Sequence, residues 1–272
     1  MSWYLPQAAA TDLADVLVCG WTARAEGEHL LVPDACMDIL WIRGVGIRVC
    51  GPETSAWSFT LPPGTESVGV RFRPGSAAPL LRIPASDLRN ARAELSDLTG
   101  SRTSRILLDR LENTPATQRV IVLEDMVRSW NRSTRSPDPV ASAVGAALAH
   151  HSWSVDALAD HAALTSRQLQ RRCNDAFGYG PATLRAILRL QRFMTLARRR
   201  SSIPLAGLAA LAGYSDQAHL SRDCRRISSM TPAELLRSEA PDWHGPGSVV
   251  TFSENVRNNQ SRSRRHPEES VA

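Results

Sequence analysis

The sequence has no lysine, few cysteines and no long apolar run, and each of these shortages excludes a class of protein. All 32 basic residues of the 272-residue chain are arginines, so a phosphate-binding loop that ends in Gly-Lys-Ser or Gly-Lys-Thr is excluded. No run of about 18 apolar residues occurs, so we expect no membrane span and no membrane partner. The N-terminus lacks a basic segment followed by an apolar one, so we expect no secretory signal.

Cysteine and histidine are too scattered to predict a metal centre or a disulfide framework. The five cysteines form no Cys-x-x-Cys pair, a pattern that fits a reduced cytoplasm. His29 is the only histidine in the first 100 residues, whereas a metal site on strands needs several clustered ligands. A Gly-x-Ser-x-Gly nucleophile turn is also missing. We therefore expect a cytoplasmic, non-enzymatic protein with no metal ion, no cofactor and no catalytic residues.

The excess of positive charge lies in one segment of the chain. Residues 1–136 and 241–272 each carry equal numbers of acidic and basic residues, whereas residues 137–240 carry 13 arginines and eight acidic residues. The whole net charge of +5 therefore belongs to that segment. A basic segment in an otherwise neutral protein is typical of a polyanion-binding surface, although a solvated helix face rich in arginine gives the same count.

The first 100 residues are predicted to form a β-rich sensor domain. Short stretches rich in Val, Ile, Trp and Phe are interrupted by Pro or Gly roughly every 8–12 residues, which is typical of a sandwich or barrel. Within residues 67–73, apolar residues alternate with Gly69, Arg71 and Arg73, which predicts a strand with one buried face.

Beyond the β domain the pattern becomes helical. Residues 101–113 and 117–131 carry apolar residues every three or four positions, which predicts two helices that either pack on the β domain or form a dimer contact. The expected organisation after residue 100 is a helical connector at 101–131, a polar linker at 132–139, a helical domain at 140–240 and a disordered tail at 241–272.

The helical domain contains the same pattern twice. The first copy contains Leu158, Ala159, Ala163, Leu169, Arg171, Cys173 and Pro181. The corresponding positions of the second copy hold Leu208, Ala209, Gly213, Leu220, Arg222, Cys224 and Pro232. The offset is 50 residues before the turn and 51 after it. In each copy a helix, a tight turn and an amphipathic helix precede a helix that starts with Pro, which is the order of a helix-turn-helix. Ala159 and Ala209 are small enough for a close helix crossing, and Gly213 suits a left-handed turn better than Ala163 does.

The second helix of each copy has one apolar and one polar face. The apolar faces carry Leu169, Cys173 and Phe177 in the first copy and Leu220, Cys224 and Ile227 in the second. Arginine and glutamine on the opposite faces suit the major groove, because arginine bonds two acceptors of guanine and glutamine bonds a donor and an acceptor of adenine. The helix predicted at 181–200 would be about 30 Å long. This length is close to the ~34 Å between successive major-groove faces, so we expect both second helices on one side of a duplex.

The two copies resemble the half-motifs of the AraC/XylS transcriptional regulators. The similar stretches are LADHAALTSRQLQRRCNDAFGYGP and IPLAGLAALAGYSDQAHLSRDCRRISSMTP, within residues 150–238, and the turn-to-leucine spacings of six and then seven are the family's own asymmetry. The resemblance implies that 140–240 is a double helix-turn-helix DNA-binding domain. It places base-reading positions at Arg167, Gln170 and Arg171 in the first copy, and at Gln217, Ala218, Ser221 and Arg222 in the second. The family usually has Phe in place of Cys173, Leu220 and Cys224, and Gly in place of Ser229, so the second copy is the less typical one.

The N-terminal half also carries a resemblance. Over roughly residues 10–100 the chain is similar to a domain of unknown function found in many actinobacterial AraC-like regulators. The similar stretches are VPDACMDILW, CGPETSAW, SVGVRFRPGSAAPLL and IPASDL. Together the two resemblances imply an α+β multidomain protein. Its N-terminal part would be a cupin-like β-barrel or sandwich with flanking helices. Its C-terminal part would be an all-α domain in which a long helix joins two helix-turn-helix motifs.

Charged residues of the β domain have two interpretations each. Asp34 and Asp38 could form a catalytic carboxylate pair, although capping of the turn at Asp34 is favoured. Arg71 and Arg73 either neutralise an anionic effector or, as favoured, point to solvent.

Two tryptophans and three arginines also have two interpretations each. Trp41 and Trp57 either line an apolar pocket or, as favoured, pack in the core. Arg185, Arg189 and Arg192 are outward residues of the predicted long helix, and they either contact DNA phosphates or are simply solvated.

The sequence thus predicts a sequence-specific transcription regulator of bacterial type. The expected partners are double-stranded DNA, RNA polymerase, a small-molecule effector at the N-terminal domain and a second copy of the chain. One alternative is an enzyme with a catalytic β domain and a helical targeting module. Another is a structural protein whose arginines contact a different protein. A steep loss of affinity with rising salt separates a DNA binder from both alternatives.

Overall fold

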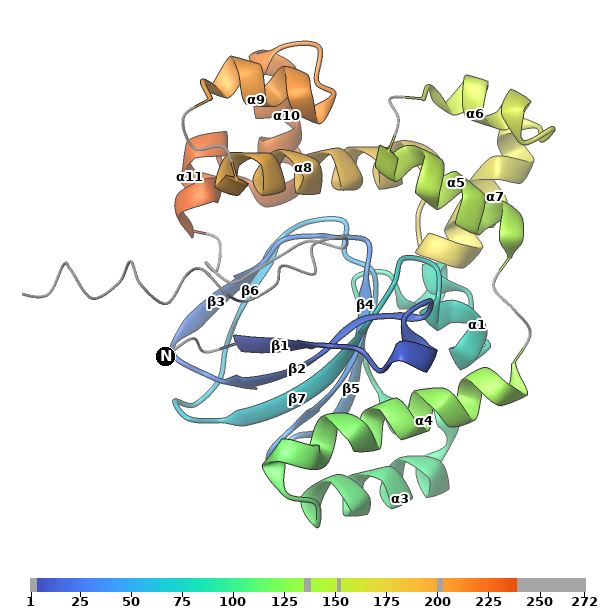
Figure 1. The fold of residues 1–272 in the computed structure, drawn as a ribbon, viewed down its shortest axis with the longest axis vertical. Coiled ribbons are helices and arrows are strands. Elements are labelled where there is room, and N and C mark those ends of the chain that lie inside the picture. Colours follow the sequence, from blue (N-terminus) through green and yellow to red (C-terminus); the bar gives the residue numbers. More distant parts are fainter. Residues whose placement is uncertain (1–3, 135–137, 151–152, 200–202, 239–272) are drawn as a thin grey trace, which may run out of the picture.

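Alternating and fully apolar stretches of the N-terminal half form strands in the computed structural model (Figure 1), which describes residues 4–134, 138–150, 153–199 and 203–238. Within the described residues the strands are β1 (Tyr4–Ala8), β2 (Leu17–Arg24), β3 (Glu28–Leu31), β4 (Met37–Ile42), β5 (Gly46–Cys50), β6 (Trp57–Thr60), β7 (Glu66–Phe72) and β8 (Arg92–Glu94). Six of them form an antiparallel sheet in the order β1-β2-β7-β4-β5-β8, and β3 pairs with β6 in a second, two-stranded sheet. All pairings are antiparallel.

Both faces of the six-stranded sheet are covered, so the prediction of one buried face is wrong for β7. Every residue from 67 to 72 is buried. Val68, Val70 and Phe72 belong to the core beneath the helices, whereas Ser67 and Arg71 line a cavity on the opposite face. Alternation of apolar and polar residues in β7 therefore does not indicate a solvent-exposed face, because the β3–β6 sheet covers the side on which the polar residues lie.

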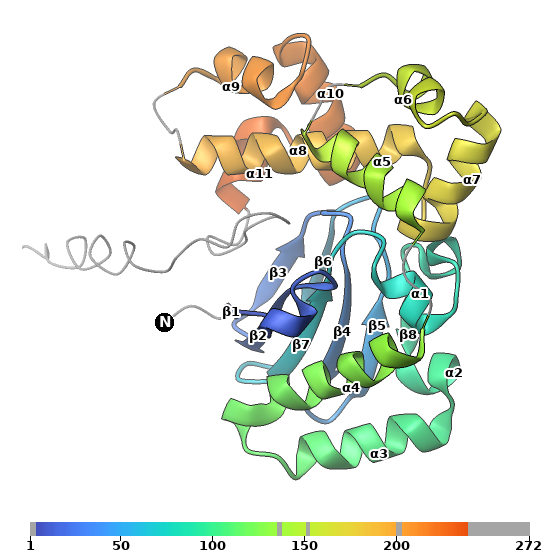
Figure 2. The ribbon, with the colours of Figure 1, turned by 45° about the vertical axis from the view of Figure 1, so that its right-hand side comes forward.

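The helices of the N-terminal half cover one face of the sheet (Figures 1 and 2). They are η1 (Thr11–Leu13), α1 (Ala77–Leu81), η2 (Ala85–Leu88), α2 (Leu95–Thr99), α3 (Ser101–Glu112), η3 (Ala116–Gln118) and α4 (Arg119–Ser133). The helices predicted at 101–113 and 117–131 are confirmed as α3 and α4. Leu123 and Val127 of α4 are fully buried against Ile39, Val70 and Phe72 in a single apolar core. Burying each such side chain contributes about 1.5–3 kcal/mol relative to leaving it exposed.

The C-terminal half consists of helices in the described residues. They are α5 (Pro139–His150), α6 (Val155–His161), α7 (Ser166–Phe177), α8 (Pro181–Arg199), α9 (Leu205–Ala212), α10 (Gln217–Ser228) and α11 (Pro232–Ser238). Side chains that accept the first free backbone N–H groups begin three of them, at Ser154, Thr165 and Asp216, as the sequence predicts. The predicted α+β class, an antiparallel sheet domain followed by a helical domain, is confirmed.

Parts of the expected connections lie outside the described residues. The predicted linker begins inside α4, which ends at Ser133, and α5 starts at Pro139, with 135–137 not described. The tail expected at 241–272 lies wholly outside the description. Among the described helices, none combines the length and apolar character needed to cross a membrane.

Gly20 of β2 permits the close approach of α4 to the sheet. A methyl group at this position would lie 2.2 Å from Cγ1 of Val120 in α4. Gly20→Ala should therefore lower the free energy of unfolding by about 1–3 kcal/mol, as measured by urea denaturation of the full chain.

The same substitution in a Val120→Ala background is the control. With the clashing methyl removed, Gly20→Ala should cost markedly less, because the two residues are in direct contact. An equal cost in both backgrounds would contradict this packing.

Candidate DNA-binding surface and ligand pocket

Helix α7 presents an arginine-rich face to solvent. A reciprocal cap begins it: Oγ1 of Thr165 accepts from the Gln168 backbone N–H at 3.2 Å, and Oε1 of Gln168 accepts from the Thr165 N–H at 2.9 Å. Leu169, Cys173 and Phe177 are buried on the inner face. The predicted base-reading residues Arg167, Gln170 and Arg171 are all exposed.

Gln170 lies along its helix rather than pointing away from it. Its Nε2 donates to Oδ1 of Asn174 at 3.3 Å, and it packs on Gly180, where a methyl group would lie 2.2 Å from that nitrogen. Gln170 must leave this position to reach a base edge, whereas the exposed Arg167 and Arg171 need no such release.

Helix α10 presents the second predicted set. Oδ1 of Asp216 accepts from the His219 N–H at 2.6 Å and begins the helix, and Leu220, Cys224 and Ile227 are buried. Gln217, Ala218 and Arg222 are exposed. Ser221 is half-buried, and its hydroxyl donates to the Gln217 carbonyl oxygen at 2.9 Å.

The two predicted sets form two clusters at opposite ends of α8. Helices α6 and α7 lie at one end and α9 and α10 at the other (Figures 1 and 2). The 19 residues of α8 give a length of about 28 Å at 1.5 Å per residue. The turns between paired helices are left-handed, with φ of 52° at Ala163 and 91° at Gly213.

Three arginines of α8 are not the free outward residues that the sequence predicted. Nη1 of Arg185 donates to the Trp153 carbonyl oxygen at 3.0 Å, and Nη2 of Arg192 donates to that of Ala149. Nη2 of Arg189 donates to Oδ2 of Asp223 at 2.6 Å, and its side chain is only 15% exposed. These contacts connect α8 to α5, to the loop before α6 and to α10, which a helical repeat pattern cannot show.

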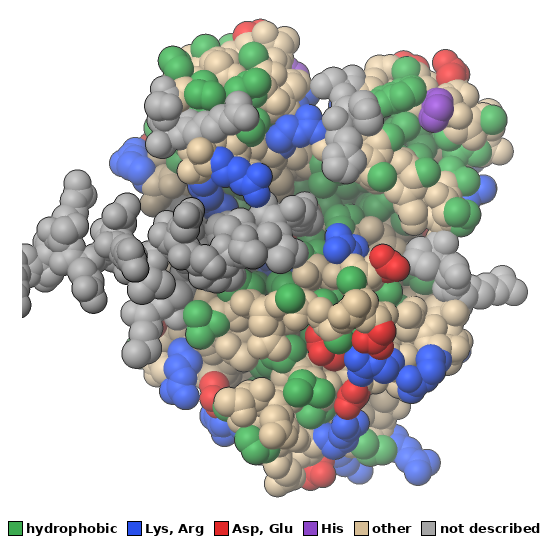
Figure 3. All heavy atoms as spheres, viewed as in Figure 1, with side chains coloured by type: hydrophobic (Ala, Val, Ile, Leu, Met, Phe, Trp, Pro, Cys, Tyr) green, Lys and Arg blue, Asp and Glu red, His purple; other side chains and the backbone are tan. Residues whose placement is uncertain are grey.

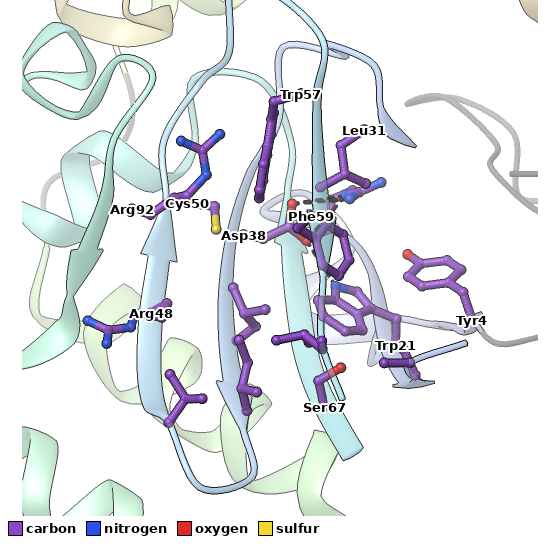
Figure 4. A pocket seen from close by; sticks show the side chains of 17 residues that line it. Tyr4, Trp21, Leu31, Asp38, Arg48, Cys50, Trp57, Phe59, Ser67 and Arg92 are labelled. Atoms are coloured by element: carbon purple, nitrogen blue, oxygen red, sulfur yellow. Dashed lines mark hydrogen bonds and ion pairs between the residues drawn. The ribbon is translucent and has the colours of Figure 1, made fainter. Parts of the chain in front are cut away.

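The N-terminal half encloses an apolar cavity of about 250 Å³ between the six-stranded sheet and the β3–β6 pair (Figure 4). Aromatic side chains from three strands, β1, β2 and β6, line it: Tyr4, Trp21, Trp57 and Phe59. The Tyr4 and Trp21 rings lie 5.5 Å apart, and those of Trp57 and Phe59 lie 5.6 Å apart. At the wall beside β8, the Arg92 guanidinium stacks 3.5 Å from the Trp57 ring.

A buried ion-pair network forms the polar floor of this cavity and corrects the prediction that Arg71 points to solvent. Nη2 of Arg71 lies 3.2 Å from Oδ2 of Asp38, and Nη1 lies 3.4 Å from Oδ2 of Asp34. Oδ1 of Asp38 also accepts from Nε1 of Trp21 at 2.9 Å. Arg73, in contrast, is exposed and donates to the Ala14 carbonyl oxygen.

Asp34 has two structural roles. Its Oδ1 accepts from the Cys36 N–H at 2.9 Å, which confirms the predicted turn capping. Burial raises the pKa of the Asp34 carboxyl, although the positive charge of Arg71 opposes that shift. The cost of burying this carboxyl is therefore offset by the neighbouring cation and by the hydrogen bond from the Cys36 N–H.

The two tryptophans considered in the sequence lie in different environments. Trp41 is 1% exposed in the core under the helices, as favoured, whereas Trp57 lines the cavity. The sequence analysis missed Tyr4, Trp21 and Phe59 as lining residues. A signal was present in β4, whose sequence MDILWI is apolar at both alternating positions apart from Asp38, as a strand covered on both faces requires.

Three hydrogen bonds connect the sheet half to the helical half. The Ala56 N–H, next to Trp57, donates to the Ile227 carbonyl oxygen of α10 at 2.6 Å. Nε2 of Gln191 in α8 donates to the Pro33 carbonyl oxygen at 2.7 Å. Nη1 of Arg89 lies 3.5 Å from the carbonyl oxygen of Gly178, which ends α7. Helices α7 and α10, and α8 between them, thus each have a contact with the domain that holds the cavity.

No group of three or more histidine, cysteine or carboxylate side chains that could hold a metal ion occurs in the described part of the chain. All five cysteines are free thiols. Burial raises the pKa of Cys50, at the cavity wall, to about 12, so this thiol is a poor nucleophile.

Comparisons with known proteins agree with this arrangement of a sheet domain followed by helix-turn-helix motifs. A family model described as "Helix-turn-helix domain" matches residues 158–238, and one described as "Domain of unknown function (DUF6597)" matches residues 6–94. The chain therefore carries a helix-turn-helix domain behind a DUF6597 domain. This confirms both resemblances seen in the sequence.

Individual relatives match over limited stretches or at low similarity. An AraC-like transcription regulator of Streptomyces antibioticus is 32% identical over 122 residues, which cover 43% of this chain and 39% of that protein. Among solved structures, ToxT from Vibrio cholerae O395 is 11% identical with a TM-score of 0.40, covering 82% of this chain and 98% of ToxT. Unsaturated fatty acid bound ToxT from V. cholerae strain SCE256 is 13% identical with a TM-score of 0.39, covering 81% and 95%. Neither score supports a conclusion about function.

Removing the Arg71 cation should destabilise the protein in a pH-dependent way. Arg71→Met leaves Asp34 and Asp38 buried without their cation, so the free energy of unfolding at pH 7 should fall by about 3 kcal/mol. Without the cation, the folded-state pKa of Asp34, which burial already raises, rises further above the unfolded value of about 3.9. The variant's deficit should therefore shrink as the pH is lowered and Asp34 takes up a proton.

The exposed Arg73 provides the matched control. Arg73→Met removes one hydrogen bond to a carbonyl oxygen and should cost about 1 kcal/mol or less. Equal losses in the two variants, or a deficit of Arg71→Met that does not change with pH in urea denaturation, would refute the buried network.

Proposed function

We propose that the protein is a non-enzymatic, sequence-specific transcription regulator that reads two successive major-groove segments of double-stranded DNA. The observation that carries this proposal is the exposure of one Arg- and Gln-bearing face on α7 and another on α10, at the two ends of α8. A helix length of about 28 Å is within reach of the ~34 Å spacing of successive major-groove faces.

Each reading helix has its own base-contacting chemistry in this proposal. On α7, Arg167 and Arg171 suit guanine, and Gln170, once released from Asn174, suits adenine. On α10, Gln217 and Arg222 supply the same two types of contact, and Ala218 offers a methyl group to a thymine methyl. Ser221 completes the set as a donor or acceptor.

The cavity of the sheet domain is the proposed effector site. Its aromatic walls favour an apolar, flat small molecule, and its ion-paired floor has little charge left to attract an ionic one. The Ala56–Ile227 hydrogen bond lies one residue from the cavity wall at Trp57 and ends on α10. A ligand that moves Trp57 would therefore bias the position of the second reading helix.

Effector control has a thermodynamic test. Coupling between the sites must be reciprocal, so an effector that changes DNA affinity by some factor has its own affinity changed by DNA to the same extent. Titrations in both orders measure the two factors, and a cavity ligand that leaves DNA affinity unchanged would exclude the coupling.

The remaining partners follow from the same proposal. The protein acts in the cytoplasm, contacts RNA polymerase and pairs with a second copy of itself. The exposed Ile106 on α3 and Ile121 on α4 support a dimer contact there. Sedimentation of the DNA-free protein tests the dimer, and co-sedimentation with purified polymerase on promoter DNA tests the other contact.

In vitro selection from random duplexes with the full chain tests the proposed function directly. A regulator of this kind enriches sites with two short conserved segments, because each reading helix contacts its own set of bases. Selection that returns no preferred sequence would reject the proposal.

Arg171→Ala should weaken binding to the selected site by about 1–3 kcal/mol and relax the preference at one base position of the first segment. Arg222→Ala should do the same in the second segment. The measurement is fluorescence anisotropy on the selected duplex and on duplexes altered at single positions.

Arg102→Ala, an exposed arginine on α3, is the charge-matched control and should leave affinity unchanged. An equal loss of affinity on every sequence would make Arg171 a phosphate contact rather than a base contact. No loss in Arg222→Ala would leave only the first motif reading bases.

Filling the cavity should block apolar ligands. Leu40 lines the cavity, whereas Leu5 is 56% exposed on β1. With 1-naphthol as probe, the Tm of the wild type and of Leu5→Trp should rise, because the ligand binds the folded state. The Tm of Leu40→Trp should not rise, because the larger side chain occupies the site. Equal shifts in all three proteins would show that the probe binds elsewhere.

A further inference from the structure

A groove lies between α8, the end of α5 and the turn of the second helix-turn-helix motif, and three arginines of α8 line it. Arg185, Arg189 and Arg192 are spaced by four and then three residues, which places them on one face of α8. The turn between α9 and α10, with His219, forms the facing wall. Its described lining contains no acidic residue, and the groove has a volume of about 510 Å³. Figure 3 shows basic side chains at the border between the two helical lobes.

The arginines of this groove are held in place but retain donors. Carbonyl oxygens of Trp153 and Ala149 accept from Arg185 and Arg192, and the Asp223 carboxylate accepts from Arg189. Nε of Arg185 and Nε of Arg189 are buried, and neither has a hydrogen-bond partner in the described part of the chain. Buried donors without an acceptor cost free energy, so the contacts within the chain leave these two guanidinium groups incompletely satisfied.

The charge of the groove favours an anion. Asp223 balances one arginine and also accepts from Arg226, whereas Arg185 and Arg192 bond only neutral carbonyl oxygens in the contacts described above. Burial and the charge of Arg189 lower the pKa of His219. Nη2 of Arg189 lies 3.0 Å from Nε2 of His219, so that nitrogen accepts, and Nδ1 lies 3.1 Å from Oγ of Ser215. Asp216, whose carboxylate begins α10, is the nearest further acid along that helix.

The position of the groove identifies the anion. On one side, Trp153 immediately precedes α6, the first helix of the first motif, and in such motifs the first helix crosses the nucleic-acid backbone. On the other side, His219 belongs to the first turn of α10, the end of a reading helix that contacts base edges. A duplex that meets both reading helices must pass its backbone across the region between them.

We propose that this groove binds one phosphate of the DNA backbone between the two major-groove segments, held by the guanidinium groups of Arg185, Arg189 and Arg192. The inference rests on the proposed function, and it adds a contact that positions the duplex without reading sequence.

The first test compares Arg185→Gln with Arg237→Gln, an exposed arginine on α11, in the full chain. Loss of one phosphate contact should reduce the slope of log Kd against log salt by about 0.9, on selected and unselected duplexes alike. Arg237→Gln should leave the slope unchanged. Equal slopes in Arg185→Gln and the wild type would overturn the proposal.

The second test alters the DNA instead of the protein, so its wild-type arm does not depend on how the variant folds. Single phosphates between the two selected half-sites are replaced by uncharged methylphosphonates. We expect one position to weaken wild-type binding strongly while having little further effect on Arg185→Gln. A scan in which no position between the half-sites weakens wild-type binding would overturn the proposal.

A free phosphate-containing anion is the other source of the same chemistry. Inorganic pyrophosphate is titrated into the DNA-free wild type and Arg185→Gln. A Tm rise specific to the wild type, together with a silent methylphosphonate scan, would assign the groove to a free anion and overturn the DNA contact.

Failure of the proposed function gives a different result. A protein that selects no sequence fails as a regulator, yet the salt slopes of Arg185→Gln and Arg237→Gln on an arbitrary duplex still decide the groove. A protein that selects two half-sites but shows equal slopes keeps its function and loses this contact.

Discussion

Burial of the apolar face of α8 fixes the positions of both helix-turn-helix motifs. Five apolar residues of α8 are fully buried in one core, which also contains the inner residues of α7 and α10. They are Leu184, Ile187, Leu190, Phe193 and Met194. Because close-packed interiors resist small displacements, the two reading helices are held relative to each other by this helix rather than by a flexible link. The polar face of the same helix supplies the three arginines that line the groove.

The same core extends into the sheet domain. Val32 and Ala35, on either side of Pro33 and Asp34, belong to the cluster around α8. Asp34 reaches in the other direction to Arg71 at the floor of the cavity. A single short segment thus contacts the cavity and the helix that spaces the motifs. Cooperation between a ligand site and a DNA-reading domain requires a connection of this kind, with different ligand affinities in two arrangements.

The sequence predicted local structure best where a local rule sets it. Helix starts at Thr165 and Asp216 follow from side-chain capping, and the reading faces follow from a 3.6-residue period within one helix. The repeat with its one-residue asymmetry identified the type of motif, which the family comparison confirms. All of these are properties of short segments, so one sequence was sufficient.

Interactions between distant segments were not predictable in the same way. The inward position of Arg71 depends on acids 33 and 37 residues earlier in the chain, and alternation on its own strand suggested a solvent face. The cavity depends on β3 pairing with β6 above the sheet, with Gly69 leaving room for the Trp21 ring, which a methyl there would approach to 2.3 Å. Arg185, Arg189 and Arg192 were correctly placed on one helix, but their partners come from elements up to 43 residues away.

Hydroxyl-radical footprinting of the full chain on its selected duplex tests most directly whether both motifs contact one face of the DNA. Two protected stretches should lie on the same side of the duplex, with centres about 10–10.5 base pairs apart, because one helix of fixed length separates the reading helices. Protection confined to a single stretch, or two stretches on opposite sides of the duplex, would contradict the account.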